Sequence, residues 1–174
     1  MMDIDEQIKI IIKGVDEIIG LDYLKDKLKK FNNNGEPLIV KLGLDPSAPD
    51  IHLGHTVVLR KMKQLQDLGH KVVIIIGDFT GKIGDPTGKA KGRKALTTEQ
   101  VLENAKTYEE QIFKVLDKDK TEVRFNSEWL SKLSFEETIR LASTMTVARM
   151  LEREEFKKRY ENQIQYQYMN FFIL

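Results

Sequence analysis

Two histidines around a glycine, in His52-Leu53-Gly54-His55, are the side chains of this chain best placed for chemistry. A helical pattern begins here, and the free N–H groups and positive dipole end at a helix start favour a phosphate group. Gly54 carries no side chain, which leaves room for a flat base to approach the backbone. The plainer interpretation makes each histidine a helix cap or a packed ring. Zinc needs further Cys, His or carboxylate partners, and the chain has no cysteine and one other histidine, His70, so we expect no protein-bound metal.

A glycine-rich segment, Gly-Asp-Phe-Thr-Gly-Lys-Ile-Gly-Asp-Pro-Thr-Gly-Lys at residues 77–89, is the second candidate. It is not a P-loop, because no Lys-Ser or Lys-Thr follows a second glycine at the required spacing. The plainer interpretation is an exposed, mobile surface loop. In the functional interpretation, a carboxylate such as Asp85 holds a substrate ammonium. Lys89 and Arg93 then close over the charge that develops on a leaving pyrophosphate.

Each of these two segments follows a predicted strand. Residues 37–44 are apolar, and residues 71–78 form a near-continuous Val/Ile run typical of a parallel strand buried on both faces. The segment between them places apolar residues at helical spacing, namely Val58, Met62, Leu65 and Leu68. A strand, a helix and a strand in this order predict a parallel sheet, in which ligands bind beyond the carboxyl ends of the strands. We therefore expect the loops at residues 45–55 and 78–93 to share one cleft.

The flanking sequence is mainly helical. Residues 4–32 predict helix with a break near Gly20, and residues 32–35 predict a closing turn. Further along, we predict capping boxes at Thr97 with Gln100 and at Ser134 with Glu137, and a short strand at residues 121–125. We divide the chain into an N-terminal helical segment at residues 1–35, a nucleotide-binding α/β unit at residues 36–162 and a distinct tail at residues 163–174.

Length and composition allow one domain with its own core, since the chain has 174 residues. The net charge is +1 with 32% charged residues, so the composition favours neither a nucleic-acid surface nor a membrane surface. The absence of cysteine fits a reducing cytoplasm. The acidic N-terminus lacks the features of a secretory signal, and no apolar run is long enough to span a bilayer. We expect a cytoplasmic protein with no membrane partner.

The two candidate segments resemble the class I aminoacyl-tRNA synthetases. His52-Leu53-Gly54-His55 resembles their "HIGH" signature, and residues 43–55 are similar to its tyrosyl-tRNA synthetase version. Residues 77–89 resemble the synthetase pattern "GDxTGxxGDPxGK", and the charged residues 146–160 resemble a part of these enzymes near the subunit interface and tyrosine pocket. The resemblance implies an α/β fold with a Rossmann-like parallel sheet of the HIGH-signature nucleotidyltransferase type. Its second half is incomplete, and an N-terminal helical segment precedes it.

The activity implied by the resemblance is tyrosine–tRNA ligation by a homodimer. ATP with Mg²⁺ activates tyrosine to tyrosyl-adenylate, and the tyrosyl group then moves to tRNA(Tyr). The implied catalytic residues are His52, His55, Lys89 and Arg93, and ATP binding is also implied for Ser47 and for Gly54 at the adenine. The residues implied on the tyrosine or adenylate side are Lys41, Gly43, Asp45, Thr80 and Asp85. Many family members have Tyr where Lys41 stands, and another branch has Lys.

The resemblance stops near Asn162, where the family continues with a segment like Pro-Ile-Ser-Ile-His-Glu-Phe-Phe-Tyr-Pro. The chain instead ends in Gln-Ile-Gln-Tyr-Gln-Tyr-Met-Asn-Phe-Phe-Ile-Leu, and a shift of reading frame reconciles the two segments. We therefore expect an N-terminal fragment, ended by a frameshift, that is inactive alone. Two alternatives stay open. One is a small nucleotidyltransferase that forms an adenylated small molecule, and the other is an inert remnant or a fragment that pairs with intact subunits.

Overall fold

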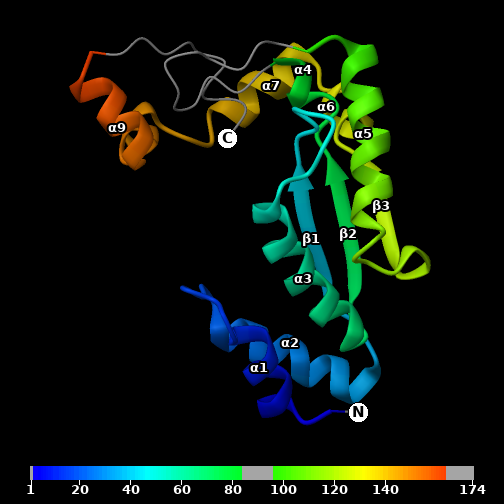
Figure 1. Ribbon diagram of the computed structural model, residues 1–174. Coiled ribbons are helices and arrows are strands. Elements are labelled where there is room, and N and C mark those ends of the chain that lie inside the picture. Colours follow the sequence, from blue (N-terminus) through cyan, green and yellow to red (C-terminus); the bar gives the residue numbers. More distant parts are fainter. Residues whose placement is uncertain (1, 84–95, 164–174) are drawn as a thin grey trace.

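The computed structural model describes residues 2–83 and 96–163 (Figure 1). The predicted site residues Asp85, Lys89 and Arg93 lie outside the described residues, and so does the tail after Gln163. A parallel sheet stands at the centre, in the strand order β1 (Ile39–Leu44), β2 (Lys71–Ile76) and β3 (Thr121–Phe125). This arrangement confirms the predicted parallel sheet, with β1 starting two residues late and β2 ending two residues early relative to the prediction.

The three strands end level with one another. Leu44 of β1 and Phe125 of β3 are both register partners of Ile76, the last residue of β2. The chain segments that leave these strands therefore emerge side by side at one edge of the sheet. This is the edge at which ligands bind in open parallel sheets.

Two long helices, α3 (Leu53–Asp67) and α5 (Thr98–Ile112), cover the same face of the sheet (Figure 1). Their apolar side chains form one core cluster with alternate residues of β2. The buried members are Leu59, Met62, Val72, Ile74, Ile76, Ala105, Tyr108, Ile112 and Leu116. Each large apolar side chain buried in this way contributes about 1.5–3 kcal/mol. The cluster therefore holds both helices against the sheet and sets where their N-termini lie.

Two details of the predicted core are wrong. β2 is not buried on both faces, because Val73 and Ile75 are only half-buried while the residues between them are buried. Both described long helices lie on the other face, so nothing among the described residues packs fully over these two side chains. On α3 the buried face includes Leu59, whereas Val58 is 43% exposed. The predicted apolar stripe is therefore wrong at Val58 and confirmed at Met62 and Leu65, which are buried.

The N-terminal segment forms two helices, α1 (Ile4–Ile12) and α2 (Leu21–Asn34), which pack together against α3. The first predicted helix is too long, because α1 ends at Ile12 and residues 13–20 form no helix. Gly20 ends this break, and its φ of 80° lies in the left-handed region that favours glycine. Gly35, with φ of 74°, ends α2 and donates its N–H to the Phe31 carbonyl. The predicted turn at residues 32–35 is therefore wrong for its first three residues, which continue the helix.

Short helices lie next to β2 and β3 along the chain. α4 (Thr80–Ile83) comes after β2, η1 (Lys118–Lys120) precedes β3, and α6 (Ser127–Leu130) follows β3. The last three helices, α7 (Phe135–Ala142), α8 (Val147–Leu151) and α9 (Glu154–Glu161), extend from the end of the sheet opposite to α1 and α2 (Figure 1). Both predicted capping boxes, at Thr97 and at Ser134, are present. Among the described residues, no helix is long and apolar enough to cross a bilayer.

Candidate functional site

A side-chain hydrogen bond joins the chain segment after β1 to the chain segment after β2. The Thr80 hydroxyl, on the first residue of α4, donates to Asp45 Oδ1 over 2.7 Å. Gly77 makes this approach possible, because a Cβ at Gly77 would lie 1.8 Å from Asp45 Oδ1 and 2.6 Å from Thr80 Oγ1. The structure thus brings together two of the residues predicted on the tyrosine side.

Asn126, directly after β3, joins this pair and was missed by the sequence analysis. Its side-chain N–H donates to Thr80 Oγ1 over 2.9 Å, and its Oδ1 accepts the Phe79 N–H over 2.9 Å. The Asn126 N–H also donates to the Ile76 carbonyl over 2.9 Å, which continues the strand ladder past β3. Asn126 is 8% exposed, so its bonds are shielded from water. A polar residue directly after a predicted parallel strand was the available signal.

Asp78 has a structural role in the same place. Its two carboxylate oxygens accept the Ser127 N–H over 2.9 Å and the Ser127 hydroxyl over 2.6 Å. Ser127 is the first residue of α6, and a negative charge at a helix start is favourable. Asp78 therefore fastens the chain after β2 to the chain after β3. The second of the two carboxylates in the glycine-rich segment, Asp85, lies outside the described residues.

The two predicted histidines cap the start of α3 reciprocally. His52 Nδ1 accepts the Gly54 N–H over 3.1 Å, and His55 Nδ1 accepts the His52 N–H over 3.1 Å. The ring centroids lie 4.0 Å apart. An Nδ1 that accepts an N–H cannot carry a proton itself, so each neutral ring holds its proton on Nε2. Both rings thus offer an Nε2–H donor at the positive end of a 15-residue helix.

The surroundings of His55 favour the neutral ring. Burial and the neighbouring His52 ring lower the pKa of His55 below its usual value, against a smaller opposing effect of the backbone bond. Its other ring neighbour is Tyr108 of α5, with centroids 6.1 Å apart. Gly54 is tightly placed as well, because a Cβ there would lie 2.9 Å from His52 Cε1. The two histidines therefore cap the helix, as the plainer interpretation predicted. The same geometry leaves their Nε2–H groups as the donors that could bind a phosphate.

The other predicted residues are more scattered. Ser47 is half-buried in the loop before α3, and its N–H donates to the Asp45 carbonyl over 2.8 Å. Lys41 and Gly43 are exposed on the face of β1 that α3 and α5 leave uncovered. Lys41 also lines a groove of about 630 Å³ between α2 and β1, whose described lining includes neither Asp45 nor the histidines. The structure therefore joins Asp45 to Thr80 and His52 to His55 by hydrogen bonds.

Comparison with known proteins identifies the family. The model of the tRNA synthetases class I (W and Y) matches residues 33–174. The chain is 70% identical over 163 residues to tyrosine–tRNA ligase 2 of Clostridium acetobutylicum, covering 94% of this chain and 41% of that protein. It is 65% identical over 163 residues to the tyrosine–tRNA ligase of Carboxydothermus hydrogenoformans, covering 92% and 40%.

A solved structure shows the same fold. The crystal structure of the Archaeoglobus fulgidus tyrosyl-tRNA synthetase, complexed with L-tyrosine, superposes with a TM-score of 0.71 at 19% identity, covering 99% of this chain and 50% of that one. The predicted Rossmann-like fold is thereby confirmed. The chain spans about 40% of the length of the two curated relatives that it matches. With 142 consecutive positions, residues 33–174, matched by one family model, the chain belongs to the class I tRNA synthetases of the tryptophan and tyrosine type.

Proposed function

We propose that this chain supplies the ATP-binding part of a tyrosine-activating site. In the proposed reaction, a tyrosine carboxylate oxygen attacks the α-phosphorus of ATP and forms a new P–O bond. The bond to the bridging oxygen breaks, and pyrophosphate leaves with the negative charge. The observation that carries this proposal is the reciprocal capping of His52 and His55, which leaves two Nε2–H donors at the start of α3. The 70% identity to a tyrosine–tRNA ligase supports tyrosine as the amino acid, rather than the substrate of a small nucleotidyltransferase.

The phosphates of ATP fit the start of α3. Positioned N–H donors stabilise charge that grows on phosphate oxygens in the transition state. His52 and His55 supply such donors, Ser47 stands in the loop that leads to them, and Gly54 leaves room for the adenine. Lys89 and Arg93 would add positive charge over the leaving pyrophosphate. Mg²⁺ would enter with ATP and supply charge neutralisation between its phosphate groups.

The amino acid fits the neighbouring strand ends. In our proposal the carboxyl of Asp45, oriented by Thr80, and the carboxyl of Asp85 face the tyrosine or adenylate. Gly43 leaves the backbone of β1 open to the substrate, and Lys41 would meet the phenol at the far end. A second step would transfer the tyrosyl group to the 3′-terminal adenosine of tRNA(Tyr). We place this activity in the cytoplasm, which the lack of cysteine favours.

Binding of Mg·ATP to the 174-residue chain tests the proposal. Isothermal titration should show one site, and His55→Ala should weaken binding by about tenfold or more, since it removes a donor to a charged group. His70→Asn is the matched control, because His70 is a buried histidine far from the proposed site, packed on Phe31 of α2. Absence of Mg·ATP binding in the presence of tyrosine, or equal loss in both variants, would contradict the proposal.

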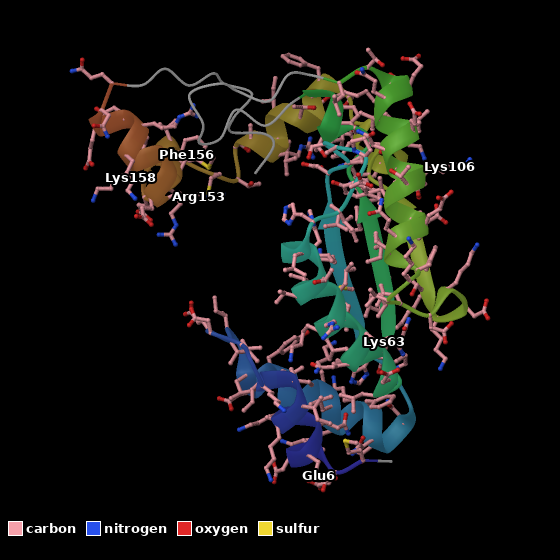
Figure 2. The ribbon with its side chains drawn as sticks, viewed as in Figure 1. Glu6, Lys63, Lys106, Arg153, Phe156 and Lys158 are labelled. Carbon is pink, nitrogen blue, oxygen red and sulfur yellow. The ribbon has the colours of Figure 1, made fainter. Side chains whose placement is uncertain are left out.

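We also propose that the chain pairs with a second copy through α7 and α8. Large apolar side chains stand exposed there, namely Phe135, Ile139, Leu141, Met145 and Val147. Exposed apolar patches of this kind mark interaction surfaces. The next helix is different: Phe156 of α9 is buried, while Arg153 and Lys158 reach into solvent around it (Figure 2). The apolar part of the proposed interface is therefore α7 with α8.

Light scattering of the eluting chain tests this pairing. We expect a concentration-dependent dimer, and Phe135→Ser with Ile139→Ser should give monomer. Ile19→Ser is the matched control, because Ile19 is 89% exposed at the opposite end of the molecule. A monomer at every concentration, or a dimer that survives the double substitution, would contradict pairing through α7.

A further inference from the structure

One face of α5 holds the loop that leads into α3. Asn104, Thr107 and Gln111 are spaced three and four residues apart, which places them on the same side of the helix. Asn104 Nδ2 donates to the Pro46 carbonyl over 3.0 Å, and Thr107 Oγ1 donates to the Pro49 carbonyl over 2.5 Å. Gln111 Nε2 donates to the Pro49 carbonyl as well, over 3.1 Å.

The Gln111 side chain both donates a hydrogen bond to the loop and accepts one from it. While its amide N–H reaches the Pro49 carbonyl, its Oε1 accepts the Ile51 N–H over 3.1 Å. Ile51 directly precedes His52, the cap of α3. Gln111 thus holds the last residue before the histidine pair from a helix 60 positions further along the chain.

Among the described residues, few other hydrogen bonds hold this loop. Residues 45–51 form no helix or strand, and their two prolines have no N–H to donate. Within this described loop, the backbone bond present is that from the Ser47 N–H to the Asp45 carbonyl. Three side chains of α5 therefore supply most of the hydrogen bonds that the described residues make to the loop. Asn104 is buried, and Thr107 and Gln111 are half-buried, so water competes only partly with these bonds.

We propose that Asn104, Thr107 and Gln111 are positioning residues that set the phosphate-binding entry of α3. The loop that they hold begins at Asp45 and ends at His52, so its path fixes the separation between the two halves of the proposed site. A misplacement of about 1 Å at a reacting centre costs on the order of a hundredfold in rate. This inference rests on the proposed function for its role in ATP binding, and on the hydrogen bonds alone for its role at His52.

Nitrogen-15 spectra of the imidazole rings test the inference without any ligand. At pH 8, the wild-type chain should show His52 and His55 as Nε2–H tautomers, because each Nδ1 accepts an N–H. Gln111→Met keeps the length of the side chain but removes both bonds, and it should turn His52 into a tautomer mixture. Glu110→Met, one position away and exposed, is the matched control. His70 is an internal reference, since its Nδ1 accepts the N–H of Leu38, which lies outside the loop.

Mg·ATP affinity gives the second measurement. Gln111→Met and Thr107→Val should each weaken binding by about tenfold, whereas Thr107→Ser and Glu110→Met should bind as wild type. If the wild-type chain does not bind Mg·ATP, the proposed function fails, and the tautomer measurement still decides the positioning role. A folded Gln111→Met chain that keeps the wild-type tautomer of His52 would overturn the inference. Equal losses of affinity in Thr107→Ser and Thr107→Val would also overturn it. Serine keeps the hydroxyl and valine lacks it, so an equal loss could not come from the missing hydrogen bond.

Discussion

Single residues decide how close the strand ends come to one another. Asp45 and Thr80 touch because Gly77 leaves the space between them empty, and Asn126 then bonds to Thr80 from the third strand. At the other pair, the cap of α3 and the proposed phosphate donors are the same two rings, His52 and His55. In both places, the side chains that shape the backbone are the ones to which we assign a role in substrate binding.

Gly77→Ala should be strongly destabilising. Its φ is not in the left-handed region, so the reason is space: the new Cβ would stand 1.8 Å from Asp45 Oδ1. Overpacking of this kind costs about 1–3 kcal/mol, and displaced hydrogen bonds add to it. Urea denaturation measures the loss. Gly81→Ala is the control, because its Cβ would meet nothing closer than 3.7 Å, and an equal loss there would rule out this explanation.

His70 should make stability depend on pH. It is 3% exposed, and burial lowers its pKa below the ordinary 6.5. Below about pH 6.5 the unfolded chain binds a proton more readily than the folded chain, so the free energy of unfolding is full above that pH and falls as the pH drops below it. His70→Asn keeps an acceptor for the Leu38 N–H but cannot titrate. Denaturation between pH 7.5 and 5.5 should therefore show a smaller slope for the variant, and parallel curves would contradict this account.

At the scale of elements, one side chain fastens the N-terminal helices to the sheet unit. Lys61 of α3 donates from Nζ to the carbonyls of Ile10, Ile11 and Lys13 over 3.2, 3.1 and 2.8 Å. These carbonyls belong to the C-terminal end of α1, where the helix dipole is negative and a cation is favourable. The apolar cluster of Ile8, Ile11, Leu28 and Leu65 packs beside this contact.

Lys61→Met should loosen α1 with little effect on the sheet. The substitution keeps the aliphatic stem and removes the charge, so about 1–2 kcal/mol of stability should be lost. Hydrogen exchange should report faster opening of residues 4–12, while β2 amides keep their protection. Lys63→Met is the matched control, since Lys63 pairs with Asp67 on the exposed side of the same helix (Figure 2). Equal changes in the two variants would show that the carbonyl contacts are unimportant.

For the whole molecule, the described residues cover one face of the sheet more fully than the other. α3 and α5 cover one face, and Val73 and Ile75 on the other face remain half-buried. Parallel sheets are ordinarily covered on both faces. A cleft beyond the strand ends that is walled on one side holds a substrate less firmly than one walled on both.

We therefore expect Mg·ATP binding but little catalysis from this chain. Tyrosine-dependent exchange of pyrophosphate into ATP should be at least about a hundredfold slower than for the Clostridium acetobutylicum relative, since substrate positioning contributes at least that factor. The two proteins are compared at equal active-site concentration. Exchange by the chain at the rate of the relative would refute this expectation.

Local features of the fold could be read from the sequence. The third strand and the two capping boxes lie where they were predicted, because each depends on residues within one turn or one strand. The first helix does not, since α1 ends at Ile12, well before the predicted break near Gly20. The histidine pair was found for the same reason, as its contacts span three residues. The roles of Lys89, Arg93 and Asp85 stay predictions, since these residues lie outside the described chain.

The sequence alone determined the family, the parallel strands and the start of α3, since these follow from short motifs and local periodicity. Tertiary structure decided which side chains meet: Thr80 reaches Asp45 across 35 positions, and Asn126 reaches Thr80 across 46. It also decided that Val73 and Ile75 of β2 are only half-buried and that Gln111 holds the loop before His52. The physical reason is that such contacts depend on strand register and helix placement, which the packing of the whole core sets and no short segment encodes.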